Sequence, residues 1–304
     1  MFDGMINVYK EKGYTSHDVV AKLRGILKQK KIGHTGTLDP DAVGVLPVCL
    51  GTGTKLCDML TDKDKVYEAV LLLGKQTDTL DISGEVIGEV DFDRFSTEHA
   101  LTEEIVREVI LSFVGKQMQI PPMYSALKVN GKKLYELARA GVEVERKARE
   151  IEVFSISILK MELPRITLSI HCSKGTYIRS LCDDIGTAIG CGGCMESLIR
   201  TKVGIFTLEN AKTLAEIEQY RDNGQLENII RKPDEMFDAP KHTMRTEFER
   251  YTENGNCITK AMLSDAGEKE KQILVYHADG TFVGVYEWDS KKKQYRPEKI
   301  FFRK

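Results

Sequence analysis

Residues 66–73 constrain the fold of this chain more than any other segment. The first of these residues alternate between apolar and polar side chains, and the last five, 69–73, form the longest uninterrupted apolar run in the sequence. Alternation is typical of a strand with one buried face, and a continuous apolar run is typical of a strand buried on both faces. We therefore expect a central strand of a sheet here, with Tyr67 near its beginning.

Helices and strands are mixed around this segment without a strict βαβ repeat. Apolar patterns predict strands at 5–9, 151–159 and 166–172, and helices near 16–30, over 134–140 and over 176–189. Capping-box pairs mark two helix starts, Thr15 with Asp18 and Thr213 with Glu216. This order indicates an α+β fold with a mixed, largely antiparallel sheet flanked by helices.

A further amphipathic helix is predicted over 102–113. Its apolar side chains recur at helical spacing and would share one face: Ile105, Val106, Val109, Ile110 and Phe113.

The pattern changes near residue 240. Beyond it, two short strands at 272–277 and 282–288 flank Asp279-Gly280, which is a strong hairpin signal. We expect a large domain over 1–239 and a small β-rich domain over 240–304.

Composition limits the class of protein. The chain has 304 residues, of which 41% are hydrophobic and 30% charged, as in water-soluble globular proteins. The longest apolar run is too short to span a bilayer, and residues 1–12 lack the apolar core of a secretory signal. Seven cysteines, an odd number, do not form a disulfide framework. We expect no membrane association, a cytoplasmic location and reduced thiols.

Two local patterns suggest other chemistry and are rejected. Cys191-Gly-Gly-Cys194 has no second ligand pair at metal-binding spacing, so we expect no metal site. Thr52-Gly-Thr-Lys55 lacks the correctly placed glycine of a phosphate-binding loop.

The net charge is only −2, but the charges are distributed unevenly. Residues 1–35 carry seven Lys or Arg against three acids, and residues 125–150 carry seven against four. Residues 83–110 carry eight acids against two arginines. A polyanion would bind the first two segments and avoid the third, although a basic run is also typical of a solvated helix face.

The segment Lys31-Ile-Gly-His-Thr-Gly-Thr-Leu-Asp-Pro40 follows no helical or strand period. Its glycines permit unusual backbone conformations, and Pro40 favours an extended Asp39, so the carboxylate lies on a shaped loop. By itself the pattern is also typical of a plain turn with a side-chain cap.

Three further segments carry side chains suited to chemistry. They are Lys65-Val-Tyr67, Pro121-Pro-Met-Tyr-Ser-Ala-Leu-Lys128 and Cys172-Ser-Lys-Gly-Thr-Tyr-Ile-Arg179. The last places Lys174, Tyr177 and Arg179 at a predicted helix start, where backbone N–H groups favour an anion. Each segment alone also has a structural explanation.

Together, these segments resemble the TruB family of tRNA pseudouridine-55 synthases. The resemblance runs from about residue 5 to 206. Besides the segments above, it includes Gly74-Lys-Gln-Thr-Asp-Thr79 and Gly131-Lys-Lys-Leu-Tyr-Glu-Leu-Ala-Arg-Ala-Gly141. It implies a pseudouridine synthase catalytic domain with a thumb-like insertion around 121–150, followed by a PUA-like RNA-binding domain.

The resemblance also implies roles for individual residues. Asp39 would be the catalytic aspartate, Tyr67 would lie against the target base, and Arg179 would pair with the aspartate. Further residues would bind the substrate: His34 by accommodating everted nucleotides, Lys10 and Tyr177 by shaping the pocket, Leu198 as an apolar wall, and Lys128 in the thumb.

This family membership would make the chain an isomerase that converts the uridine at position 55 in the T loop of tRNA into pseudouridine. The reaction gains and loses no atoms, so no cofactor is expected. The thumb-like segment matches that of family members that act alone. The resemblance therefore implies that the chain needs no guide RNA and no obligate protein partner. The alternative hypothesis is a tRNA-binding folding factor for which catalysis is secondary. The sequence departs from the family pattern at Glu11, where proline is usual, and at Ile199, where arginine is usual.

Overall fold

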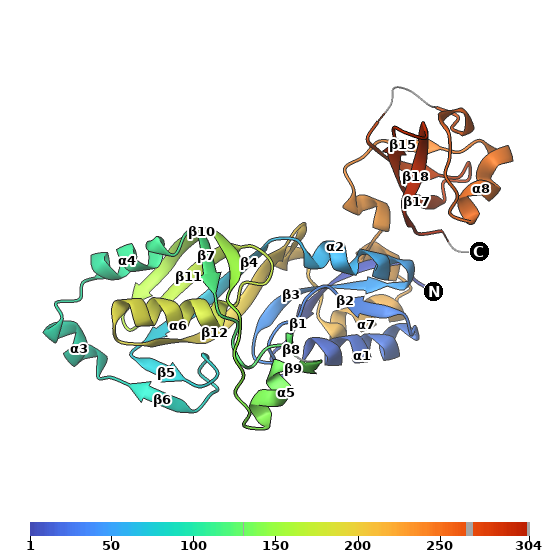
Figure 1. Cartoon of the computed structure of the whole chain (residues 1–304). Coiled ribbons are helices and arrows are strands. Elements are labelled where there is room, and N and C mark those ends of the chain that lie inside the picture. The colour runs from blue at the N-terminus through green and yellow to red at the C-terminus, as the bar shows by residue number, and fades with distance from the viewer. Residues whose placement is uncertain (130, 266–269, 303–304) are drawn as a thin grey trace.

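A computed structural model describes residues 1–129, 131–265 and 270–302. Figure 1 shows a large sheet with helices packed against it and a smaller β-rich part near the C-terminus. None of the helices formed by the described residues is both long and apolar enough to cross a membrane.

The large sheet has ten strands, eight of them in the order β14-β1-β3-β12-β4-β11-β10-β7. All neighbours along this path are antiparallel except β12 and β3. The fold is therefore mixed and largely antiparallel, as expected. The strands are β1 (Gly4–Lys10), β3 (Val43–Leu50), β4 (Lys65–Leu73), β7 (Gly115–Gln119), β10 (Arg149–Glu162), β11 (Arg165–Cys172), β12 (Gly193–Val203) and β14 (Ile230–Arg231), with β2 (Ile32–His34) beside β3 and β13 (Phe206–Thr207) beside β12.

Strand β4 lies between β11 and β12, inside the sheet. Its apolar residues Ala69, Leu71 and Leu73 are buried, which confirms the prediction of a central strand. Its partner β12 was not predicted, because that segment mixes charged and apolar residues. Strand β3 was also missed, since Gly44 and Pro47 interrupt its apolar pattern.

Helices α6 (Ile178–Ile189) and α4 (Glu103–Ser112) pack together beside the sheet (Figure 1). Helix α6 ends at Gly190, which adopts a left-handed conformation with φ 96°. Val106 and Ile110 of α4 are buried against Leu181 and Ile185 of α6 in one apolar core. The expected apolar face of α4 is wrong at Ile105, which is 44% exposed.

Helices α1 (Ser16–Leu27) and α7 (Leu214–Asp222) contact each other and cover a second apolar core. Both begin with the predicted capping boxes, in which Thr15 and Thr213 accept hydrogen bonds from the backbone N–H groups of Asp18 and Glu216. Helix α1 ends earlier than residue 30 because Lys28 adopts a left-handed conformation with φ 47°.

The remaining helices and strands are short and lie outside the large sheet. They are α2 (Cys57–Thr61), β5 (Lys75–Thr77), β6 (Val86–Glu89), α3 (Phe92–Glu98), β8 (Lys128–Val129), β9 (Lys132–Lys133) and α5 (Leu134–Arg139), with short 3-10 helices at Gly51–Leu56, Leu208–Asn210, Leu226–Ile229, Pro233–Met236, Thr246–Phe248 and Lys260–Met262. We use "thumb" for residues 121–150, which include β8, β9 and α5.

The C-terminal part contains a four-stranded sheet in the order β15-β16-β17-β18. The predicted hairpin is present as β16 (Gln272–Tyr276) and β17 (Phe282–Asp289), which pair antiparallel, while β15 (Lys241–Thr243) is parallel to β16 and β18 (Gln294–Ile300) completes the sheet. Leu274 and Phe301 pack against Leu56 and Leu60 of the larger part. The boundary between residues 239 and 240 and the PUA-like assignment stay predictions.

The central strand gives a direct test of the fold. Leu71→Ala would remove a fully buried side chain of β4 and is expected to lower the free energy of unfolding by about 2–5 kcal/mol. Ile87→Ala, on the exposed strand β6, should change it by less than about 0.5 kcal/mol. Urea denaturation measures both. Equal effects of the two substitutions would contradict the central position of β4.

Candidate active site

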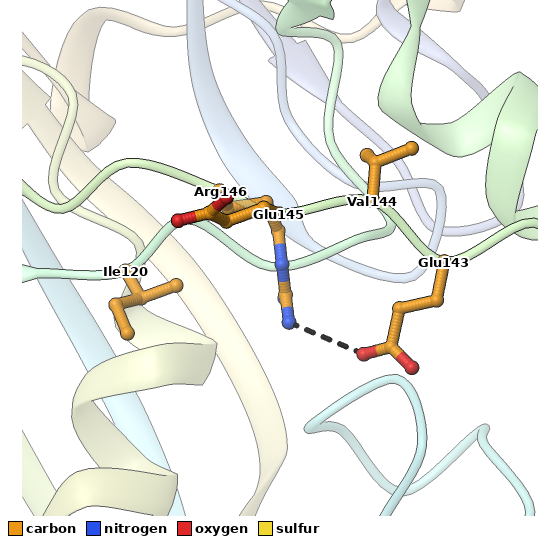
Figure 2. Close-up of a pocket in the computed structure, with 5 residues that line it drawn as sticks. All are labelled: Ile120, Glu143, Val144, Glu145 and Arg146. Carbon is orange, nitrogen blue, oxygen red and sulfur yellow. Dashed lines mark ion pairs between the residues drawn. The ribbon is translucent and has the colours of Figure 1, made fainter.

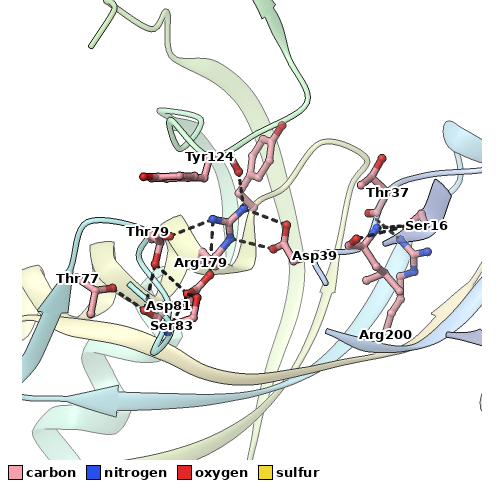
Figure 3. Close-up of polar contacts among 12 residues, drawn as sticks. Ser16, Thr37, Asp39, Thr77, Thr79, Asp81, Ser83, Tyr124, Arg179 and Arg200 are labelled. Atoms are coloured by element: carbon pink, nitrogen blue, oxygen red, sulfur yellow. Dashed lines mark hydrogen bonds and ion pairs between the residues drawn. The ribbon is translucent and has the colours of Figure 1, made fainter. Parts of the chain in front are cut away.

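Asp39 and Arg179 lie at the centre of the site. Asp39 is on the loop between β2 and β3, and Arg179 is in the first turn of α6. Arg179 Nε is 2.9 Å from Asp39 Oδ2, and Arg179 Nη2 is 3.2 Å from Asp39 Oδ1. The guanidinium therefore holds both carboxylate oxygens, a geometry that fixes the direction of the carboxylate (Figure 3).

Arg179 is itself fixed by backbone carbonyls from two other segments. Its Nη1 donates to the carbonyl of Thr79 at 3.0 Å, and its Nη2 donates to that of Tyr124 at 2.8 Å. The residue is 4% exposed. Arg179 thus joins the Asp39 loop, the segment after β5 and the thumb (Figure 3).

Asp81 is a second acidic partner of Arg179 that was missed in the sequence. Its Oδ2 is 3.7 Å from Arg179 Nη1, while its Oδ1 accepts from the hydroxyls of Thr79 at 2.8 Å and Ser83 at 2.5 Å. The signal was present, because Asp81 lies two residues after the end of the Gly74-to-Thr79 motif. These hydrogen bonds fix the position of the Asp81 carboxylate.

Opposing effects set the acidity of Asp39. Burial raises the pKa of this carboxyl above its ordinary value of 3.8, the positive charge of Arg179 lowers it, and the negative charge of Asp81 raises it again. The net shift is upward. The side chain is nevertheless 37% exposed, so the carboxylate remains accessible to a substrate.

Tyr67 lies on β4 opposite Arg200 of β12. Burial raises the pKa of its phenol, and the charge of Arg200 acts against this rise. The phenol is consequently protonated at neutral pH. Arg200 is the second residue missed by the sequence analysis, which noted only the unusual Ile199 beside it.

Lys10 is fully buried and holds the loop that carries Asp39. Its ammonium donates to the carbonyls of Glu11 at 3.1 Å, Tyr14 at 2.6 Å and Pro40 at 2.9 Å. Burial lowers the pKa of Lys10 to about 8, against the charge of Asp39. Glu11 contributes to this arrangement through its carbonyl, so the departure from proline leaves Lys10 anchored.

Tyr177 and Leu198 lie close to this centre. The backbone of Tyr177 is held by Gln119, whose side chain accepts from the Tyr177 amide at 2.8 Å and donates to its carbonyl at 3.0 Å. That amide is therefore already bonded, and the anion expected at this helix start stays a prediction. Leu198 is buried in the same apolar cluster as Tyr67.

His34 and Lys128 lie at the periphery. The His34 ring centroid is 5.1 Å from that of His17, and burial followed by the charge of His17 lowers the His34 pKa, which favours the neutral ring. Lys128 is exposed on β8 of the thumb. Among the described residues, no group of three or more His, Cys, Asp or Glu is arranged to hold a metal ion.

A separate hollow of about 460 Å³ lies along the thumb (Figure 2). Ile120 and residues 143–146 line it, and an ion pair of 3.6 Å between Arg146 and Glu143 crosses it. Arg146 also donates to the carbonyl of Pro121 at 3.2 Å, which ties the two arms of the thumb together. The residues that line this hollow do not include Asp39, Tyr67 or Arg179. The hollow therefore belongs to the thumb and is not the catalytic centre.

Comparisons with known proteins identify the family of this chain. Residues 24–178 match the TruB family pseudouridylate synthase N-terminal domain, and residues 179–237 match the tRNA pseudouridylate synthase B C-terminal domain. The class of protein is thus an RNA pseudouridine synthase. The chain belongs to the TruB family.

Close relatives extend the match over nearly the whole chain. A tRNA pseudouridine synthase B of Lachnoclostridium phytofermentans is 55% identical, covering 98% of this chain and 99% of the relative. One of Clostridium perfringens is 45% identical over 95% and 96%. Among solved structures, a Cbf5-Nop10-Gar1 complex contains a chain that matches with a TM-score of 0.70 and 26% identity, covering 98% of this chain and 85% of that chain.

The electrostatics of Asp39 can be measured directly. Carboxyl ¹³C NMR should show Asp39 titrating above 3.8, since burial outweighs the attraction of Arg179. Asp81→Asn removes a negative charge that raises this pKa, so the titration should move to lower pH. An Asp39 titration at or below 3.8 in the unchanged protein, or an upward move in Asp81→Asn, would contradict this description.

Proposed function

We propose that this chain isomerises uridine to pseudouridine at position 55, in the T loop of tRNA, without a guide RNA. The observation that carries the proposal is the Asp39 carboxylate, held through both oxygens by Arg179 and still partly exposed. The relatives that match over nearly the full chain are named tRNA pseudouridine synthase B, which supports tRNA as the substrate.

The reaction breaks the N1–C1′ bond, turns the base and joins C5 to C1′. The sugar carbon becomes electron-poor as the first bond breaks, and a carboxylate such as Asp39 can add to it, remove an adjacent proton or stabilise its charge. The isomerisation exchanges no atoms with a second reactant, so we propose that it requires no cofactor. Arg179 keeps the carboxylate directed at one point.

The target base must leave its stack before the carboxylate can reach its sugar. We assign Tyr67 as the aromatic face for the flipped base, because base flipping requires a stacking partner in the site. Leu198 forms the adjoining apolar wall, Lys10 and Tyr177 shape the pocket, and His34 accommodates the nucleotides opened around the target. A neutral His34 ring suits such contact with bases.

The thumb supplies charge for binding the T arm. Lys128, Lys132 and Arg139 are exposed on it, well suited to phosphate contacts. This segment is part of the chain itself, which supports action without a guide RNA or an obligate protein partner. Because the proposed substrate is tRNA, we propose the cytoplasm as the compartment in which the protein acts.

The exposed thumb charges take no part in the contact between Asp39 and Arg179, which keeps the folding-factor hypothesis as a second candidate. Binding by the thumb could speed the refolding of tRNA even when the carboxylate is absent. The two activities are compatible, and a variant that loses only catalysis distinguishes them.

Asp39→Asn should lower turnover by more than about 10³-fold, because the amide cannot act at C1′ as a carboxylate does. Tritium release from tRNA transcript labelled at C5 measures turnover, and filter binding measures tRNA affinity, which should be unchanged. Asp41→Asn, an exposed aspartate in the same loop, is the matched control and should remain active. Retained turnover in Asp39→Asn would refute the proposed function of this carboxylate; faster tRNA refolding by the same variant would establish the second activity.

Binding to tRNA should weaken at least about tenfold between about 50 and 200 mM salt, since phosphate contacts release counterions. Replacing Lys128 and Lys132 with Gln should reduce the slope of log affinity against log salt by about one for each lysine. Lys160→Gln, which removes a charge already paired with Glu162, is the control. Affinity that is independent of salt would contradict the phosphate contacts.

A further inference from the structure

Arg200 is a buried cation that the roles above leave unexplained. It lies on β12 and is 1% exposed. Within the described residues, no carboxylate forms an ion pair with it. Burial of an unpaired charge is unfavourable unless its donors are well used, so the contacts of this guanidinium require an explanation.

Those contacts lead to the loop that carries Asp39. Arg200 Nη2 donates to the carbonyl of Gly36 at 3.3 Å, and Nη1 approaches that of Thr37 at 3.5 Å. Its Nε donates at 2.8 Å to the carbonyl of Val45, where β3 begins. Figure 3 shows Arg200 below Thr37, and Asp39 to the left of both. One side chain thus fixes both the loop and the strand that follows it.

Tyr67 and Arg200 are direct neighbours across the β4 and β12 pair. Side chains of directly opposite residues leave a sheet on the same face, and the charge of Arg200 acts on the Tyr67 phenol against the rise in pKa that burial causes. The side chain that holds the loop of Asp39 therefore lies next to Tyr67. The five N–H donors of an arginine lie in one plane, so the positions of its acceptors are set relative to one another.

Two glycines make this arrangement possible. Gly44 has φ 107°, and a side chain there would lie 2.3 Å from the carbonyl oxygen of Arg200. Gly36 has φ 133°, with Arg200 Nη1 3.8 Å from where its Cβ would be. Glycine at position 44 lets the start of β3 pack directly on Arg200, and glycine at position 36 lets the loop adopt a backbone conformation that other residues rarely take.

Other contacts hold the loop but do not reach Tyr67. The amide of Leu38 donates to Ser16 Oγ at 2.9 Å, and Lys10 donates to the carbonyl of Pro40 at 2.9 Å. Ser16 and Lys10 restrain the loop against α1 and β1. Arg200 restrains it against the strand pair that carries Tyr67.

We infer that Arg200 is a positioning residue that sets the Asp39 carboxylate and the Tyr67 ring in register with each other for the reaction. This inference rests on the proposed function. Arg200 itself touches no reacting atom in this account. Its loss should therefore lower the rate of the chemical step and leave tRNA affinity and folding in place.

The test uses the full chain with Arg200→Lys and Arg200→Met. Lysine keeps the charge but loses the planar set of donors, and methionine fills the space without charge. Single-turnover tritium release should slow by about 100-fold or more in both, because small misplacement of reacting groups has effects of that size. The dissociation constant for tRNA should stay close to that of the unchanged protein, and the variants should fold with a lowered melting temperature, because carbonyls bonded by Arg200 lose their donor. Arg165→Lys, an exposed arginine on β11 paired with Glu196, is the matched control and should react normally.

A chemical rescue separates positioning from general packing. In Arg200→Ala, low-millimolar methylguanidinium should restore part of the single-turnover rate, whereas methylammonium should not. Either of two results would overturn the inference: a folded Arg200→Lys with a rate within about threefold of the unchanged protein, or a rate loss matched by an equal loss of tRNA affinity. Failure of all three variants to fold would also overturn it, since the sheet and not the loop would then depend on Arg200. If the unchanged chain showed no turnover, the proposed function would fail instead.

Discussion

The guanidinium of Arg179 is the contact on which the rest of the site depends. It holds both oxygens of Asp39. It also donates hydrogen bonds to the carbonyls of Thr79 and Tyr124, which fix its own position. Three segments distant in sequence meet on one side chain at the start of α6. Arg179 is 4% exposed, so its buried charge depends on these partners for compensation. The catalytic loop, the segment after β5 and the thumb are coupled through this residue.

Three cations hold the loop around Asp39, together with the apolar packing of Leu38 and Ala42. Arg179 binds the carboxylate, Lys10 binds the carbonyl of Pro40, and Arg200 binds carbonyls earlier in the loop. The charges of Arg179 and Lys10 counter the burial that raises the pKa of Asp39. A loop held by many directed hydrogen bonds can stay ordered while one face remains open. This arrangement reconciles a fixed carboxylate with access for a flipped nucleotide.

Much of this arrangement could be predicted from local sequence. Strand β4 follows from its apolar run, α6 from its pattern and Gly190, and the helix starts at Thr15 and Thr213 from their capping boxes. Asp39, Tyr67 and Arg179 were recognised by motif, and the structure brings Asp39 and Arg179 into contact. The catalytic and binding roles of the site residues stay predictions.

The missed features arise from contacts between distant segments. Strand β12 has two register shifts where it pairs with β4, so its side chains do not keep the regular period of a strand. In the sequence, Arg200 looks like an ordinary surface arginine. Only the pairing of β12 with β3 and β4 buries it. Asp81 acts through Arg179, about a hundred residues further along the chain. Ile105 has the right spacing for a buried face, yet its side chain is 44% exposed, because spacing alone does not determine what packs over a helix.

A structure of this chain with tRNA that carries 5-fluorouridine at the target position tests the central claim most directly. The account predicts that the fluorinated nucleotide is flipped out of the T loop, with its C1′ beside the Asp39 carboxylate and its base against the ring of Tyr67. Arg179 should still hold Asp39 in that complex. A target nucleotide that stays stacked in the RNA, or one whose C1′ lies beside a different carboxylate, would contradict the account.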